Sequence, residues 1–179
     1  RVIGILPVPR AVDLARAYAA AGFRTLKLKV GREPREDVAR VRAIRQALGP
    51  EVALRVDANQ GYDLQTAIWV LRRLEECELL YVEQPLPAAD LDGLRVLRRH
   101  LPMRIMADEG VHTPADALRL AAERLVDVFA IKLIKTGGLW QARKVAAIAE
   151  AAGIACVVVS PFETQIGAAA GLHLAVSLE

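Results

Sequence analysis

The sequence is poor in aromatic residues, in long apolar runs and in excess charge of either sign. Phe, Trp and Tyr make up 4% of the 179 residues, so a folded core has to be built from Ala, Leu and Val. Lys and Arg outnumber Asp and Glu by only 24 to 21, without a basic block interleaved with aromatics, which argues against nucleic acid as a partner. No apolar run approaches the roughly 18 residues of a membrane helix, so no membrane partner is expected.

Cysteine is also scarce. The two cysteines, Cys77 and Cys156, are too few for a disulfide framework, and both lie in or beside apolar stretches. They are expected to be buried, reduced thiols. This cysteine usage, together with the lack of a signal-peptide pattern in the first residues, predicts a cytoplasmic protein. With 54% apolar residues the chain can build a substantial core and is not disordered.

One unit repeats along the chain. Short apolar, β-branched runs alternate with stretches of helical periodicity, and this strict alternation implies a parallel sheet with right-handed crossovers. The predicted strands are 2–6, 25–30, 52–56, 79–82, 104–107, 128–131 and 155–159. The predicted helices are 11–21, 34–48, 64–76, 91–100, one that begins at Pro114 with Thr113 as its N-cap, 139–152 and 168–178.

Both a doubly wound sheet and a β/α barrel fit this alternation. The turn after the first run carries no Gly-x-Gly-x-x-Gly motif, which weighs against a dinucleotide-binding sheet, and the even unit length favours a TIM-type barrel. The fold class is therefore predicted as α/β, with about seven strand–helix units in one domain over residues 1–179. A complete barrel usually needs about 250 residues. We therefore expect an incomplete barrel, either part of a larger protein or a homo-oligomer that covers its open sheet edges.

Charged residues stand at the C-terminal ends of five successive predicted strands. They are Lys29, Asp57, Glu83, Asp108 and Lys132, at intervals of 28, 26, 25 and 24 residues. Each interval is one strand–helix unit, so all five side chains are expected at the same end of the barrel. Active sites of such barrels lie at that end, so the five charges are candidates for chemistry.

Three of these five groups are carboxylates on adjacent strands. Asp57, Glu83 and Asp108 would repel one another if crowded together, unless a cation neutralised them. A hard divalent cation with oxygen ligands, Mg²⁺ or Mn²⁺, fits three carboxylates completed by water and a substrate oxygen. The alternative is that each carboxylate is solvated and paired with a nearby arginine.

The lysines stand on both sides of these carboxylates. Lys27 and Lys29 are two residues apart on a strand, so they point to one face with Cα atoms roughly 7 Å apart. Two such close ammonium groups depress each other's pKa, and a lysine brought towards neutrality can act as a base. Lys132 lies on the sixth strand, across the barrel mouth. This set suits abstraction of a proton next to a carboxylate, with the metal stabilising the enediolate; a solvated edge strand is the alternative for the paired lysines.

Together these motifs resemble the enolase superfamily over essentially the whole chain. Residues 25–31 resemble its Lys-x-Lys strand, residues 56–61, 82–86 and 107–109 its three metal-ligand strands, and residues 131–138 its sixth strand. Lys-x-Lys with a sixth-strand lysine resembles the muconate-lactonizing-enzyme subgroup. The mandelate racemase subgroup instead places a His on the seventh strand, and residues 157–163 contain none.

The resemblance implies roles for the charged residues. Lys29 would be the acid/base on one face of the substrate. Lys132 would serve the opposite face in racemases and epimerases, or act as an electrostatic stabiliser in cycloisomerases. Lys27 would tune Lys29 and help neutralise the substrate carboxylate. The remaining implied residues are Asp57, Glu83 and Asp108 as Mg²⁺ (or Mn²⁺) ligands, Asn59 and Glu109 as supporting groups, Glu163 near the substrate, and Lys135 with the Gly137–Gly138 pair as shapers of the turn.

The leading functional hypothesis is a muconate or chloromuconate cycloisomerase-like enzyme acting on a small-molecule carboxylate, because residues 54–69 look closest to those enzymes. Dipeptide epimerases, N-acylamino acid racemases and o-succinylbenzoate synthases share the same catalytic set. The family's N-terminal capping domain and its eighth strand are expected outside residues 1–179, so an inactive barrel fragment stays open. A phosphate-binding barrel enzyme that uses Thr136–Gly138 is a further alternative.

Overall fold

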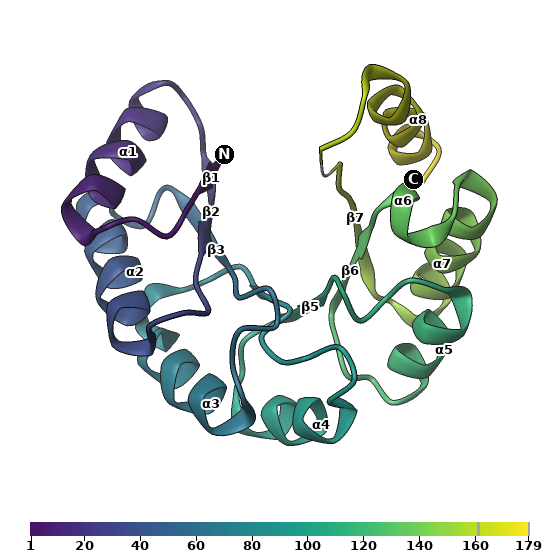
Figure 1. Ribbon diagram of the computed structural model, residues 1–179, viewed down its shortest axis with the longest axis horizontal. Coiled ribbons are helices and arrows are strands. Elements are labelled where there is room, and N and C mark those ends of the chain that lie inside the picture. Colours follow the sequence, from purple (N-terminus) through teal and green to yellow (C-terminus); the bar gives the residue numbers. More distant parts are fainter. Residues whose placement is uncertain (161, 179) are drawn as a thin grey trace. The chain divides into compact units, whose positions relative to one another are not determined.

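The computed structural model describes residues 1–160 and 162–178 (Figure 1). Pro161 lies outside the described residues. It is one of residues 157–163, the segment in which the sequence contains no seventh-strand His. The chain separates into two compact units, Arg1–Arg104 and Ile105–Glu179, and each contains parallel strands that alternate with helices. The α/β prediction is confirmed in both units, and the prediction of a single domain over the whole chain stays a prediction.

The first unit contains four parallel strands in sequence order. Lys29 on β2 is the register partner of Asp57 on β3, and Asp57 is the register partner of Glu83 on β4. Helices α1, α2 and α3 follow one another along one side of the strands (Figure 1). The elements are β1 Val2–Ile3, α1 Val8–Ala20, β2 Thr25–Lys29, α2 Pro34–Leu48, β3 Ala53–Asp57, α3 Leu64–Arg73, the 3₁₀ turn η1 Glu75–Cys77, β4 Val82–Glu83 and α4 Leu91–His100.

The second unit contains three parallel strands, also in sequence order. Helices α5 and α7 pack against each other, and α7 also packs on β6 and β7. Strand β6 pairs with both β5 and β7, and all four of its residues are buried. The elements are β5 Ile105–Ala107, α5 Pro114–Ala122, β6 Val128–Ile131, α6 Leu133–Thr136, α7 Leu139–Ala152, β7 Ala155–Val158 and α8 Gln165–Val176.

The predicted elements differ from the observed ones mainly at their ends. Helix α1 begins at Val8 rather than at residue 11, because Pro9 fits a first helical turn. The fourth strand covers Val82–Glu83 rather than residues 79–82, and the helix predicted to reach residue 76 ends at Arg73 and continues as a 3₁₀ turn. The short helix α6 was not predicted. No helix of the described chain is both long and apolar enough to cross a membrane.

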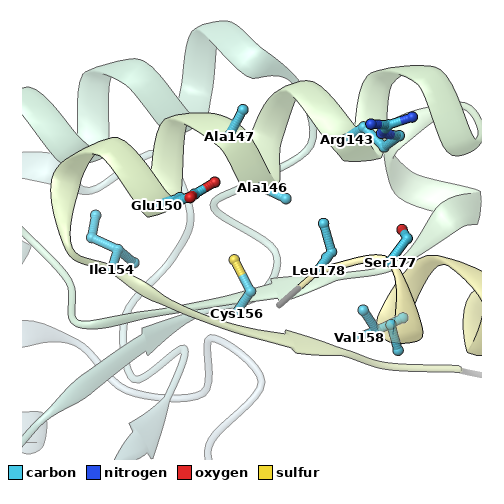
Figure 2. Close-up of a pocket in the computed structure, with 10 residues that line it drawn as sticks. Arg143, Ala146, Ala147, Glu150, Ile154, Cys156, Val158, Ser177 and Leu178 are labelled. Carbon is cyan, nitrogen blue, oxygen red and sulfur yellow. The ribbon is translucent and has the colours of Figure 1, made fainter.

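The prediction of two buried thiols is right for one of them. Cys77 is buried, whereas Cys156 on β7 is only partly buried. Cys156 lines a cavity of about 450 Å³ in the second unit and points from β7 towards helix α7 (Figure 2). Burial raises the pKa of the Cys156 thiol to about 11, so it is protonated and weakly nucleophilic at neutral pH.

The predicted N-cap of α5 is a complete capping box. The Thr113 hydroxyl accepts a hydrogen bond from the Asp116 N–H at 3.2 Å, and the Asp116 carboxylate accepts one from the Thr113 N–H at 2.9 Å. Partial burial would raise the pKa of Asp116, but the hydrogen bonds from Thr113 and His112 and the nearby Arg119 hold it below its usual range. The carboxylate form is therefore the one that stabilises the helix start.

Asp116→Asn is expected to lower the free energy of unfolding by about 1 kcal/mol at pH 7. Because the native pKa is depressed, the contribution of Asp116 is complete above its unfolded-state pKa of about 3.9 and is lost as pH falls through the native value. Urea unfolding at a series of pH values should show the difference from wild type shrinking below about pH 4. Asp13→Asn, on the exposed face of α1, is the control; a difference of equal size at every pH would contradict the assignment.

Candidate active site

The first unit brings four of the predicted charges into one cluster. The Lys27 ammonium nitrogen lies 2.9 Å from Asp57 Oδ2 and 3.0 Å from each carboxylate oxygen of Glu83. The Lys29 ammonium lies 2.6 Å from the same Asp57 oxygen and also donates to the side-chain carbonyl of Asn59. Asp57 and Glu83 are 1% exposed, so their negative charges depend on these partners rather than on water.

Strand register places these side chains. Because β2, β3 and β4 are parallel and in register at their C-terminal ends, Lys29, Asp57 and Glu83 stand side by side. Alternation along β2 puts Lys27 and Lys29 on one face, while Leu26 and Leu28 are fully buried on the other. The alternation therefore decides that both lysines reach the carboxylates.

The loops after β3 and β4 are joined by backbone hydrogen bonds. The Ala58 N–H donates to the Glu83 carbonyl at 3.0 Å, and the Gln60 N–H donates to the Gln84 carbonyl at 2.8 Å. Asn59 and Gln84 have φ of 44° and 39°, in the left-handed region that non-glycine residues enter at a cost. This strained pair of loops fixes the strand ends that carry Asp57 and Glu83.

Electrostatics in the first unit differ from the sequence prediction. Burial would lower the pKa of Lys27, but the charges of Glu83 and Asp57 outweigh burial and raise that pKa. Burial would likewise raise the pKa of Asp57, but hydrogen bonds and charge from Lys29 and Lys27 hold it below its usual range. The expected lowering of the lysine pKa is therefore wrong for Lys27. Two carboxylates lie within about 3 Å of its ammonium, and their attraction outweighs the cost of burying the charge.

The second unit holds a separate cluster around Asp108, which follows β5. Lys132 donates a hydrogen bond to one Asp108 oxygen, and the Lys135 ammonium lies 2.7 Å from the other. Burial would raise the pKa of Asp108, but these two lysines keep it low. Burial lowers the pKa of Lys135, and Asp108 offsets this only in part.

Lys135 is the group that the sequence reasoning missed. It was expected to shape the turn after the sixth strand, yet its ammonium also lies 3.1 Å from the Ala130 carbonyl and contacts Asp108. The signal was available: Lys132 and Lys135 are three residues apart, and on a helical turn that spacing brings two side chains to one side. Because the sequence pattern predicts no helix at Leu133–Thr136, it does not bring the two lysines together.

Two further predicted residues lie in the second unit. Glu109 follows Asp108 directly, is partly buried and acts to raise the pKa of Lys135 by its charge. Glu163 precedes α8, accepts a hydrogen bond from the Ser160 hydroxyl at 2.9 Å and packs against Gly167. Within its unit, Glu163 is therefore held by the chain that follows β7.

The donor set suits a hard divalent cation. Asp57 and Glu83 are buried carboxylates that both contact the Lys27 ammonium, at 2.9 and 3.0 Å, and Asp57 also contacts the Lys29 ammonium at 2.6 Å. Carboxylate oxygens are the ligands that Mg²⁺ prefers. Within the described residues, no group of three or more His, Cys, Asp or Glu side chains is spaced to hold a metal ion. The first unit thus supplies two of the three predicted ligands, and Asp108 belongs to the second.

Charged side chains at the C-terminal ends of parallel strands that alternate with helices are typical of β/α enzyme domains. The family model described as "Enolase C-terminal domain-like" matches residues 10–179. The chain belongs to this family, which confirms the resemblance read from the strand-end motifs.

Similar proteins cover most of this chain. It is 42% identical over 174 residues to the L-Ala-D/L-Glu epimerase of Bacillus subtilis, which covers 96% of the chain and 47% of that protein. It is 44% identical over 154 residues to the chloromuconate cycloisomerase of Delftia acidovorans, covering 85% and 41%. A crystal structure of the dipeptide epimerase from Enterococcus faecalis V583, complexed with Mg and the dipeptide L-Leu-L-Tyr, matches with a TM-score of 0.94 at 40% identity, covering 97% and 49%. The chain spans about half the length of these relatives.

Proposed function

We propose that the protein containing this chain is a metal-dependent enzyme that moves a proton on the carbon next to a carboxylate, with a dipeptide as substrate. The observation that carries the proposal is the cluster of Lys27 and Lys29 on the buried pair Asp57 and Glu83. Two lysines on two buried carboxylates combine a cation site with a proton-transfer group.

The two lysines of β2 have different roles in this proposal. The Lys27 side chain is 12% exposed and held between two carboxylates, so it contributes fixed positive charge. Lys29 is 31% exposed, so its ammonium is the one that can reach a substrate and transfer the proton. Asn59 accepts a hydrogen bond from Lys29 and orients it.

The roles proposed for the other charged residues rest on the spacing of the strand ends in the sequence. Asp57, Glu83 and Asp108 are proposed to hold Mg²⁺ (or Mn²⁺), with Glu109 in support. When bound, the cation would offset the negative charge that develops on the substrate carboxylate as the proton leaves. Lys132 is proposed as the acid/base for the opposite face, and Glu163 as a group near the substrate. A homo-oligomer also stays a prediction.

A dipeptide is favoured as substrate because dipeptide epimerases occur among both the curated relatives and the similar solved structures. Epimerisation would also use both Lys29 and Lys132, because removing a proton from one face and returning it to the other needs a group on each side. The second candidate is cycloisomerisation of muconate or chloromuconate, which was the leading hypothesis from the sequence. Its support is the 44% identity to chloromuconate cycloisomerases.

The test is proton exchange in D₂O with Mg²⁺, followed by NMR in the full-length protein. L-Ala-L-Glu should lose its glutamyl α-proton signal and yield L-Ala-D-Glu. Glu83→Gln is expected to lower the rate at least about 10²-fold, because a buried carboxylate of the cation site is lost. Glu75→Gln, an exposed carboxylate in η1, should leave the rate unchanged.

Other outcomes separate the alternatives. Turnover of cis,cis-muconate without exchange on any dipeptide of a broad panel would favour the cycloisomerase. Exchange that proceeds equally without a divalent cation, or equally in Glu83→Gln, would overturn the proposed site. If the protein catalyses neither α-proton exchange nor cycloisomerisation under any of these conditions, the proposed function is overturned.

A further inference from the structure

A second polar cluster lies in the first unit, behind the strand that carries Lys29. Asp37 and Arg40 stand on helix α2, and Tyr62 lies in the loop before α3. Their exposed fractions are 0%, 2% and 2%, so none of them can touch a substrate directly. The strand-end pattern in the sequence did not include any of the three.

The cluster is built around the Asp37 carboxylate. Asp37 Oδ2 accepts hydrogen bonds from the Gly31 N–H at 2.9 Å, from the Arg32 N–H at 3.2 Å and from the Tyr62 hydroxyl at 2.8 Å. Its other oxygen pairs with the Arg40 guanidinium. Burial and the hydrogen bond to Asp37 raise the pKa of Tyr62, so its hydroxyl stays protonated and donates to Asp37.

Arg40 and Tyr62 connect the cluster to the end of β2. Arg40 Nη2 donates to the backbone carbonyl of Lys29 at 3.3 Å, and Nη1 donates to the Leu6 carbonyl at 3.4 Å. The Tyr62 hydroxyl accepts a hydrogen bond from the Gly31 N–H at 3.1 Å. These three buried side chains therefore hold the backbone at residues 29, 31 and 32 by hydrogen bonds.

Stability alone is a poor explanation for this arrangement. A buried ion pair generally contributes little more to folding than well-packed apolar side chains of similar volume. Arg40 Nε is buried without a hydrogen-bond partner among the described atoms, which adds a cost. What the cluster does supply is a fixed backbone position for the residue that bears the reactive ammonium, and angstrom-scale placement matters greatly for proton transfer.

We propose that Asp37, Arg40 and Tyr62 form a positioning network that sets where the Lys29 ammonium meets the substrate. This inference rests on the proposed function, because it assigns Lys29 to one face of the substrate carbon. The three residues act through the Lys29 backbone and the Gly31–Arg32 turn, so they are positioning residues. A network on one lysine should affect proton transfer on one face only.

Tyr62→Phe tests the network in the full-length protein with Mg²⁺, L-Ala-L-Glu and L-Ala-D-Glu in D₂O. The substitution removes the hydroxyl that bridges Asp37 and the Gly31 N–H but keeps the buried ring. Early deuterium incorporation is measured from each epimer. The epimer whose exchange depends on Lys29 is the one whose exchange Lys29→Met abolishes. Its exchange rate should fall about tenfold in Tyr62→Phe with KM little changed, and exchange from the other epimer should stay within about twofold of wild type.

Two further variants sharpen this test. Tyr18→Phe makes the same chemical change on α1, where the ring packs edge-on against Phe23 and its hydroxyl makes no hydrogen bond within the described residues; it should leave both rates unchanged. Arg40→Lys keeps a charge for Asp37 but loses the geometry of the contacts to the Lys29 and Leu6 carbonyls, and should repeat the one-sided loss. It also serves if Tyr62→Phe does not fold.

Each outcome has a distinct meaning. If wild type exchanges both epimers and Tyr62→Phe and Arg40→Lys lower both rates in parallel, the cluster is merely structural and the inference is overturned. The same follows if neither variant changes either rate. If wild type exchanges no α-proton at all, the proposed function is overturned, and this inference is overturned with it because it rests on that function.

Discussion

Lys29→Met is expected to abolish interconversion of dipeptide epimers, with a fall in kcat of about 10³-fold, within the range of general acid–base catalysis. Exchange of the α-proton in D₂O should be lost for one epimer and retained for the other. The reason lies in the cluster: Lys27 is held between Asp57 and Glu83, so it cannot replace the more exposed Lys29 ammonium. NMR of each epimer separately gives both rates.

The matched control is Lys144→Met. Lys144 is exposed on α7, and its ammonium lies 5.1 Å from the centre of the Trp140 ring. Its removal takes away the same charge and should leave both rates unchanged. Retained interconversion in Lys29→Met would show that Lys29 is not the proton-transfer group. Equal loss of exchange from both epimers would show that it is not specific to one face.

Gly61→Ala is expected to lower the free energy of unfolding by about 3 kcal/mol, at the upper end of overpacking effects. A Cβ on Gly61 would lie 2.2 Å from the Gly31 carbonyl oxygen and 2.7 Å from the Gly31 Cα. Both neighbours are backbone atoms, so no side-chain rotation relieves the clash. The loops after β2 and β3 would have to separate, and the hydrogen bond from the Gly31 N–H to the Tyr62 hydroxyl spans those loops.

Gly4→Ala is the control for that substitution. A Cβ at Gly4 would meet no atom within 4 Å, so the free energy of unfolding should change by no more than about 0.5 kcal/mol. Urea denaturation of both variants measures the difference. Equal stability of the two variants would mean that the Gly31–Gly61 approach is not a constraint on the fold.

Much of the candidate site could be predicted from residue spacing. In a parallel α/β chain every strand–helix unit returns to the same sheet edge, so charges one unit apart are brought together whatever the loops do. This is why spacing alone groups Lys29, Asp57 and Glu83, and the structure places them side by side in the first unit. The two-residue spacing of Lys27 and Lys29 likewise fixed their common face.

The sequence could not show which charges pair or what holds them. The pKa of Lys27 depends on whether another ammonium or two carboxylates lie nearer, and only the register of β2, β3 and β4 decided for the carboxylates. Lys135 joins Asp108 because α6 forms one helical turn where a loop was expected. The Asp37–Arg40–Tyr62 cluster joins residues that periodicity assigned to a helix face and a loop.

Local rules acting along the chain determined the alternating strands and helices, the shared sheet edge and the residue types at that edge. Alternation in strands and periodicity in helices depend on near neighbours, which a sequence displays directly. The tertiary structure alone decided the partners of each buried charge, because a polar group removed from water is satisfied by whatever the packing brings within about 3 Å. For Asp37 those partners come from residues 31, 32, 40 and 62, a set that local spacing does not specify.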